Sequence, residues 1–120
     1  MSQTNVIMKV RPVNGKTFFI DIQGDVNANA ENALVDAYNQ ATSAGAKDII
    51  LNFAQLDYMN SSGIGLLVTL LIRAKRQNQQ LLACHLGEHY RQIFELTRLN
   101  EAIDIYDTEA DVLRAIPIAR

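Results

Sequence analysis

A short polar segment followed at once by an apolar run is the feature that most constrains how this chain can fold. Residues 60–63 are Asn-Ser-Ser-Gly, and mostly apolar residues follow them as far as Ile72. Asn and Ser are favoured at helix N-termini because their side chains accept hydrogen bonds from the unpaired N–H groups of the first turn. The sequence therefore predicts a helix that begins near residue 61 and ends near Arg76, with a serine hydroxyl at its positive end.

This predicted helix is unusually apolar. An ordinary surface helix buries one apolar stripe, whereas here the apolar residues cover more than one: Ile64, Leu66, Leu67, Val68, Leu70, Leu71 and Ile72. Two interpretations are open. The helix is packed between a sheet and a neighbouring helix, or its N-terminal part docks a partner, since apolar surface marks an interface only where it is exposed.

Strand signals recur along the chain. Alternating residues predict strands over 6–10 and 17–23, and Asn14-Gly15 between them is a strong hairpin signal because both residue types tolerate positive φ. Gly24 to Asn29 has the composition of a turn that ends a strand and caps a helix. Short apolar segments bounded by polar residues predict three buried strands, at 48–53, 80–86 and 103–106.

Helical spacing fills the segments between these strands. Besides the helix at 61–76, it predicts a helix over 30–41 that ends near Gly45, one over 88–97, and a last one that Thr108 and Asp111 cap and Pro117 closes. The order is ββαβαβαβα. This order predicts an α/β fold with a mostly parallel mixed sheet and an N-terminal antiparallel hairpin. Ligand and partner sites in such folds lie at the carboxyl ends of the strands.

Composition limits the class of protein. The 120 residues are 48% apolar and 20% charged, which predicts one globular domain over residues 1–120. A net charge of −2 without a basic cluster argues against nucleic-acid binding. No apolar run approaches the roughly 18 residues that span a membrane, and no signal peptide is visible. The single cysteine, Cys84, excludes an internal disulfide and fits the cytoplasm.

Enzyme motifs are absent from the sequence. Gly63 and Gly65 lack the third glycine of a dinucleotide loop, because position 68 is Val. A hydrolase nucleophile needs a glycine two residues before its serine, which neither serine has. Cys84, His85 and His89 have no ligand spacing that favours a metal. We therefore expect no catalytic activity, no cofactor and no metal site.

The adjacent serines Ser61 and Ser62 remain as the candidate functional residues of the chain. Capping alone is the commoner role of serines before a helix and is worth about 1 kcal/mol. The alternative is a phosphorylation switch, because a phosphoryl group at this position would be stabilised by the helix dipole while adding about two negative charges to the surface. If a partner packs over the adjacent apolar residues, that charge would oppose binding.

The segment Asp57-Tyr58-Met59-Asn60-Ser61-Ser62-Gly63-Ile64-Gly65 resembles the signature of STAS-domain anti-sigma factor antagonists, in which Asp-Ser-Ser/Thr-Gly-Leu-Gly opens a hydrophobic helix. Gly24-Asp25-Val26-Asn27 resembles the family's Gly-Glu-Leu-Asp turn. Phe94-Glu95-Leu96-Thr97-Arg98-Leu99 resembles its Leu-Glu-Leu-Thr-Gly-Leu segment. The resemblance covers essentially the whole chain in the same order of elements.

The resemblance implies a cytoplasmic bacterial protein that acts by partner switching. The unphosphorylated form would bind an anti-sigma factor that is also a serine kinase and so free the sigma factor. Phosphorylation of Ser61 would reverse this, and a PP2C-type phosphatase would reset it, without contact to DNA or insertion into a membrane. The residues expected to bind the partner are Asp25, Asn27, Asn60, Ser61, Ser62, Gly63, Ile64 and Leu67.

Three residues depart from the family pattern. Asn27 and Asn60 stand where the family has aspartates, so two negative charges are missing from the predicted edge while hydrogen-bonding capacity is kept. Arg98 replaces a glycine that closes a helix.

A second function is an alternative to the partner-switching antagonist. The chain would then be a STAS subunit of a membrane transport or stress-sensing complex that docks a fixed partner without phosphorylation.

Overall fold

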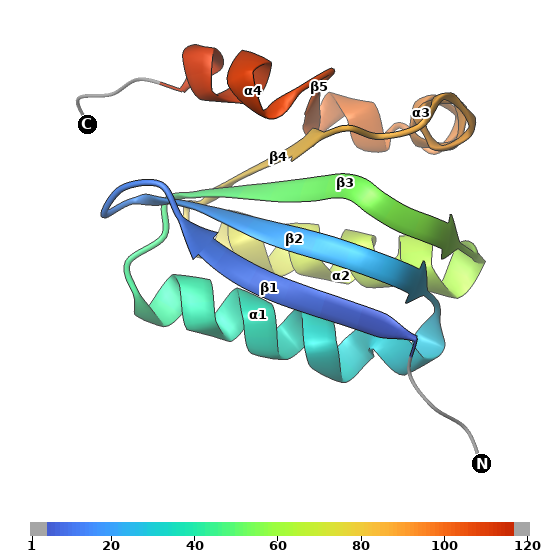
Figure 1. The fold of residues 1–120 in the computed structure, drawn as a ribbon, viewed down its shortest axis with the longest axis horizontal. Coiled ribbons are helices and arrows are strands. Elements are labelled where there is room, and N and C mark those ends of the chain that lie inside the picture. The colour runs from blue at the N-terminus through green and yellow to red at the C-terminus, as the bar shows by residue number, and fades with distance from the viewer. Residues whose placement is uncertain (1–4, 117–120) are drawn as a thin grey trace.

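The computed structural model of the protein describes residues 5–116 (Figure 1). The elements, in order, are β1 (Val6–Pro12), β2 (Thr17–Val26), the 3₁₀ helix η1 (Ala28–Ala30), α1 (Glu31–Ser43), β3 (Asp48–Met59), α2 (Ser61–Arg76), β4 (Gln80–Cys84), α3 (Glu88–Leu96), the 3₁₀ helix η2 (Leu99–Glu101), β5 (Asp104–Tyr106) and α4 (Glu109–Ala115). The predicted order ββαβαβαβα is confirmed.

The five strands form one mixed sheet in the order β1-β2-β3-β4-β5. β1 pairs antiparallel with β2, and every other pair is parallel. The predicted hairpin and parallel sheet are therefore both confirmed. The carboxyl ends of β2 and β3 meet at one edge, from which η1 and α2 begin (Figure 1).

Successive side chains of a strand point to opposite faces of the sheet. Buried side chains form a core on each of the two faces. Helices α1 and α2 cover one face (Figure 1), where Ile20, Leu51 and Leu67 belong to the larger cluster of buried side chains. The helix α4 covers part of the other face, where Val112 packs with Phe19 and others in a smaller cluster. Much of the rest of this second face carries polar side chains, among them Lys9, Arg11, Asp21 and Asn52, together with the exposed Ile7.

Strands β2 and β3 are longer than predicted. The strands predicted over 17–23 and 48–53 extend to Val26 and Met59. The two extensions pair with each other, with two register shifts along the way. Gly24 enables this geometry. It has φ +98°, and a Cβ there would lie 1.9 Å from the Asn5 carbonyl oxygen, so the glycine marks a close backbone approach rather than a turn.

The other boundaries differ by a few residues, and two strained positions explain some of the differences. β4 ends at Cys84, two residues earlier than predicted, because His85 adopts a left-handed φ of 57°. Arg98, in place of the family's glycine, closes α3 with φ 62°, so the expected strain is present. The predicted cap of α4 is confirmed, because Thr108 Oγ1 accepts a hydrogen bond from the Asp111 N–H at 3.1 Å. Pro117 lies outside the described residues.

Helix α2 buries one stripe and exposes another. Its buried residues are Gly63, Leu67, Leu70 and Ala74. On the outward side, Val68 is 39% exposed and Ile72 is 47% exposed. Helix α2 packs against β3, β4 and the neighbouring helix α1, as the first interpretation expects. It also leaves Val68 and Ile72 exposed on its outward side, so apolar surface is available there as well.

Candidate functional site

The site predicted around Ser61 is assembled where β2 and β3 end side by side. Val26 and Met59, the last residues of these strands, are register partners. The backbone N–H of Asn60 donates to the Val26 carbonyl at 3.2 Å. Asn27 and Asn60, which are 33 positions apart in the sequence, therefore leave the sheet next to each other.

Each of these asparagines caps the helix that follows it. Asn60 Oδ1 accepts a hydrogen bond from the Gly63 N–H at 2.9 Å, and Asn27 Oδ1 accepts one from the Asn29 N–H at 2.8 Å. Both residues have extended backbone, as N-caps require. The cap of α2 is thus the asparagine and not a serine hydroxyl.

Gly63 lets α2 begin directly against the end of β2. A Cβ at this position would lie 2.3 Å from the Val26 carbonyl oxygen and 2.9 Å from the Met59 Cγ. Real side chains essentially never make such short contacts, so only glycine fits without displacing the helix. Met59, 3% exposed, fills the space beneath it.

A tyrosine from α3 holds the other side of the same segment. Because the N–H of Asn60 points to β2, the N–H of Met59 points the opposite way, beyond the last β3–β4 pair at Asn52. That N–H donates to the Tyr90 Oη at 2.9 Å. The Met59–Gly63 segment is therefore fixed by β2, by its own cap and by α3.

The structure brings most of the predicted site residues together at this edge. Ser61 and Ser62 are exposed on the first turn of α2, whereas Asn27, Asn60 and Ile64 are partly exposed. Asp25 is also partly exposed, but it precedes the core residue Val26 in β2, so its side chain points to the opposite face of the sheet. Gly63 is buried and acts through its lack of a side chain. Leu67 does not join them, because its side chain is 1% exposed and lies in the core. Val68 and Ile72, which were predicted as apolar residues of this helix but not as site residues, have exposed side chains on its outward side.

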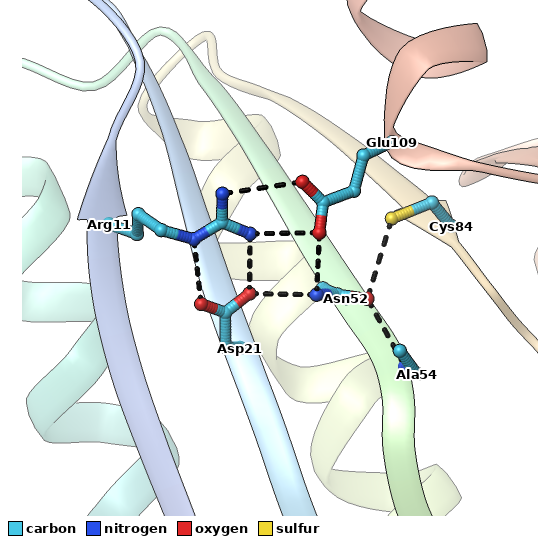
Figure 2. A network of polar contacts seen from close by, with 6 residues as sticks. All are labelled: Arg11, Asp21, Asn52, Ala54, Cys84 and Glu109. Atoms are coloured by element: carbon cyan, nitrogen blue, oxygen red, sulfur yellow. Dashed lines mark hydrogen bonds and ion pairs between the residues drawn. The ribbon is translucent and has the colours of Figure 1, made fainter.

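A second polar cluster lies on the opposite face of the sheet (Figure 2). Arg11 on β1 forms ion pairs with Asp21 on β2 at 2.8 Å and with Glu109 on α4 at 3.0 Å. Asn52 on β3 donates to both carboxylates, at 2.8 and 3.2 Å. The Cys84 thiol donates to Asn52 Oδ1 at 3.7 Å. This cluster connects four strands and α4.

The charges in this cluster argue for a structural role. The hydrogen bond from Arg11 keeps the pKa of Asp21 below its usual value, despite an opposing effect of burial. Burial, together with the charges of Glu109 and Asp21, raises the pKa of Cys84 to about 12. A thiol with such a pKa is protonated at neutral pH and is a poor nucleophile. The donors and acceptors satisfy one another, and the cluster attaches α4 to the sheet.

At the edge where β2 and β3 end, the exposed start of α2 carries Ser61, and Asn60 rather than the Ser61 hydroxyl caps the helix. Known proteins share the fold that surrounds Ser61. The family model for the STAS domain matches residues 8–112. The chain belongs to the STAS domain family.

Individual relatives support this family. A Bordetella bronchiseptica protein, BtrV, assigned as an anti-sigma factor antagonist, is 30% identical over 77 residues, which are 63% of this chain and 66% of that protein. Among solved structures, the anti-sigma factor antagonist SpoIIAA in its unphosphorylated form has a TM-score of 0.70 at 21% identity, over 91% of this chain and 99% of SpoIIAA. The Bacillus SpoIIAA in its phosphorylated form has a TM-score of 0.70 at 20% identity, over the same shares of the two chains.

These likenesses to SpoIIAA concern the fold, which this STAS domain shares over 91% of its length. Within residues 5–116, no helix combines the length and the apolar character needed to cross a membrane. In the same part of the chain, no group of three or more His, Cys, Asp or Glu side chains is arranged to hold a metal ion.

Proposed function

We propose that this STAS domain is a cytoplasmic anti-sigma factor antagonist that acts by partner switching. Its unphosphorylated form binds an anti-sigma factor with serine kinase activity, which then releases its sigma factor. Phosphorylation of Ser61 by that kinase ends the interaction, and a PP2C-type phosphatase restores it. The whole chain forms this one domain, and it acts without catalysis of its own.

One observation carries this proposal: the cap of α2 does not use the Ser61 hydroxyl. Asn60 accepts the hydrogen bond from Gly63, and no hydrogen bond among residues 5–116 involves the side chain of Ser61. The exposed hydroxyl is therefore available as a phosphoryl acceptor. Capping, the alternative role of the serine, is already performed by its neighbour.

The surroundings of Ser61 give phosphorylation a physical effect. A phosphoryl group adds about −1.5 to −2 charges at neutral pH, and the positive end of α2 stabilises it on the free domain. Ile64, Val68 and Ile72 lie along the outward side of the same helix and are at least partly exposed. A partner that covers this stripe would have to desolvate the phosphate, so binding is weakened. The proposed contact surface is thus the predicted set with Val68 and Ile72 in place of Leu67, and without Asp25, whose side chain points to the opposite face of the sheet.

Relatives support the same function. The Bordetella protein and SpoIIAA are both described as anti-sigma factor antagonists, and SpoIIAA exists in phosphorylated and unphosphorylated forms. The backbone of the Met59–Gly63 segment is held on three sides, by β2, by the cap and by Tyr90. Holding the segment that carries the acceptor lowers the cost of positioning Ser61 for phosphoryl transfer.

The test is to incubate the protein with ATP and the anti-sigma factor kinase of the same organism and to measure mass gain and binding. We expect one phosphoryl group, mapped to Ser61 by peptide sequencing, and loss of kinase binding in Ser61→Asp. The matched control is Ser62→Ala, which should still be modified. Absence of modification in the wild-type protein, with unchanged binding by Ser61→Asp, would contradict the switch.

A further inference from the structure

The sheet has an uncovered surface on the side opposite to α1 and α2. Helix α4 packs on β4 and β5 and covers Phe19 near the start of β2. Helix α3 directs Phe94 into the core on the other side of the sheet, which α1 and α2 cover. Towards the carboxyl ends of β2 and β3 the surface is therefore open, and Ile7 is 50% exposed and Tyr58 is 55% exposed.

Irregular pairing places additional side chains of β3 on this uncovered surface. In the second half of the strand the residues that face the core are three positions apart: Phe53, Leu56 and Met59. Two register shifts against β2 produce this spacing, since a regular strand turns every second residue inward. Each interval therefore holds two exposed residues, which are Ala54 with Gln55 and Asp57 with Tyr58. Such bulges re-aim side chains and are over-represented next to functional sites.

Two adjoining hollows cross the same surface. The larger, of about 550 Å³, lies between β1 and Glu109 on α4. The smaller, of about 310 Å³, reaches Asp57 near the end of β3. Both are lined by Ile7 and Gln23, so together they form one groove over β1, β2 and β3. We call this surface the open face, and its residues are Ile7, Gln23, Asp25, Gln55, Asp57 and Tyr58.

The larger hollow is electrically balanced. Arg11 forms ion pairs with Asp21 and with Glu109. Lys9 is the register partner of Asp21, and its positive charge acts on that carboxylate. Two cations thus face two carboxylates, and this end of the groove offers no net charge to a partner.

The other end of the groove is acidic. Asp57 lines the smaller hollow and directly precedes Tyr58, and Asp25 is the register partner of Tyr58. Within residues 5–116 neither of these carboxylates forms an ion pair. Uncompensated negative charge therefore flanks an exposed aromatic ring.

We propose that the open face docks a segment of a second partner protein through an arginine side chain. A guanidinium group stacks on an aromatic ring and pairs with carboxylates. Tyr58, flanked by Asp25 and Asp57, offers both contacts, and Ile7 offers apolar surface to the neighbouring residues of the segment. The uncompensated carboxylates repel the phosphates of nucleic acids and of acidic lipids, so the charge of this face favours a basic protein segment.

The open face is separate from the surface of the proposed function. Val26 and Met59 face the core that α1 and α2 cover, so the side chains that precede them, those of Asp25 and Tyr58, point to the opposite side of the sheet. The exposed stripe of α2 lies beyond that core. Docking at the open face therefore requires neither the kinase nor phosphorylation of Ser61.

A titration with defined peptides tests this docking. The isotope-labelled protein is titrated with a short peptide of alternating arginine and glycine, and the amide signals are followed by NMR at about 50 mM salt, where exposed charges are weakly screened. We expect saturable shifts at the open face and none along the exposed stripe of α2. The same peptide made with lysine should bind several-fold more weakly, because an ammonium group lacks the planar stacking and paired hydrogen bonds of a guanidinium.

Substitutions at exposed positions locate the contact. Tyr58→Ala should weaken binding of the arginine peptide about two- to fivefold, as expected for one exposed cation–π contact. Asp25→Asn and Asp57→Asn should each weaken it about twofold at low salt and less at high salt. The matched control is Asp36→Asn, which removes an exposed carboxylate of α1 on the other side of the sheet and should leave binding unchanged. Ser61→Asp should bind the peptide as the wild type does.

Three results would overturn the proposal. If the open face shows no saturable shifts, or if Tyr58→Ala binds like the wild type, no arginine docks there. Equal affinity for the arginine and lysine peptides would leave charge attraction without stacking on the ring. Sedimentation of the protein alone gives the third result: a dimer that Tyr58→Ala dissociates would make a second copy of the chain the occupant. Failure of the proposed function is a different outcome, because it concerns Ser61 and α2 and leaves peptide binding intact.

Discussion

The Tyr90 hydroxyl on α3 accepts a hydrogen bond from the backbone N–H of Met59 at 2.9 Å. β4 has already ended at this level of the sheet, so a side chain takes the place of a neighbouring strand. The bond connects a helix that carries no predicted site residue to the segment that presents Ser61. Tyr90 is therefore a positioning residue for the site.

Replacing Tyr90 by Phe removes only this acceptor. We expect a loss of about 1 kcal/mol in the free energy of unfolding, as for one hydrogen bond in a partly buried place. Amide hydrogen exchange at Met59 should accelerate, while the amides of β1 and β2 should not change. The control is Tyr106→Phe on β5, far along the chain from the site. Equal exchange at Met59 in the wild type and in Tyr90→Phe would show that the hydroxyl does not hold the segment.

Gly63 and Gly65 form a matched pair in the first turns of α2. A Cβ at Gly63 would collide with the Val26 carbonyl at 2.3 Å, whereas a Cβ at Gly65 would meet no atom within 4 Å. Gly63→Ala should destabilise the protein by about 2 kcal/mol or more through overpacking and a displaced helix. Gly65→Ala should stabilise it by about 0.5–1 kcal/mol, because alanine is the better helix former. Urea unfolding of the two variants measures this contrast, and equal effects would contradict the close approach at Gly63.

Protonation of the Asp21 carboxyl should lower the stability of the protein in acid. Arg11 holds the pKa of this carboxyl below its usual value in the folded state, and the unfolded value is about 3.9. The contribution of the ionised Asp21 carboxyl to folding stability is therefore present above its unfolded pKa, and it is lost as the pH falls through its folded pKa. The free energy of unfolding of the wild type should exceed that of Asp21→Asn by about 1 kcal/mol at pH 7, and the difference should shrink below about pH 4. A difference that is independent of pH would exclude the ion pair as its source.

The order of elements was predictable because each signal is local. Asn14-Gly15 predicts the hairpin from two adjacent residues, and Asn60 predicts the start of α2 from the first turn alone. The extensions of β2 and β3 were not predictable, because the residues at 24–26 and 54–59 have the composition of turns and exposed segments. They are strands because each pairs with the other, which no local pattern records.

Contacts between distant parts of the chain escaped the sequence analysis for a similar reason. Arg11 and Glu109 are 98 positions apart, and neither belongs to a motif. Tyr90 lies in the helix predicted over 88–97, but its hydrogen bond to Met59 depends on where β4 ends. The predicted set of partner contacts was wrong at Leu67 because a helix that is apolar on several sides does not reveal which side faces the sheet.

The neighbouring residues Leu67 and Val68 separate stability from partner binding. Leu67 is 1% exposed and Val68 is 39% exposed. Leu67→Ala should cost about 2–5 kcal/mol of unfolding free energy through the cavity it leaves. Val68→Ala should leave stability within about 0.5 kcal/mol of the wild type but should weaken binding of the anti-sigma factor kinase, since it removes apolar surface from the same side of α2 as Ser61. Urea unfolding and calorimetric binding distinguish the two effects, with Ile72→Ala as a second test of the outward stripe. If both Val68→Ala and Ile72→Ala bind the kinase with wild-type affinity, the partner does not cover this stripe, and its contacts are confined to the ends of β2 and β3.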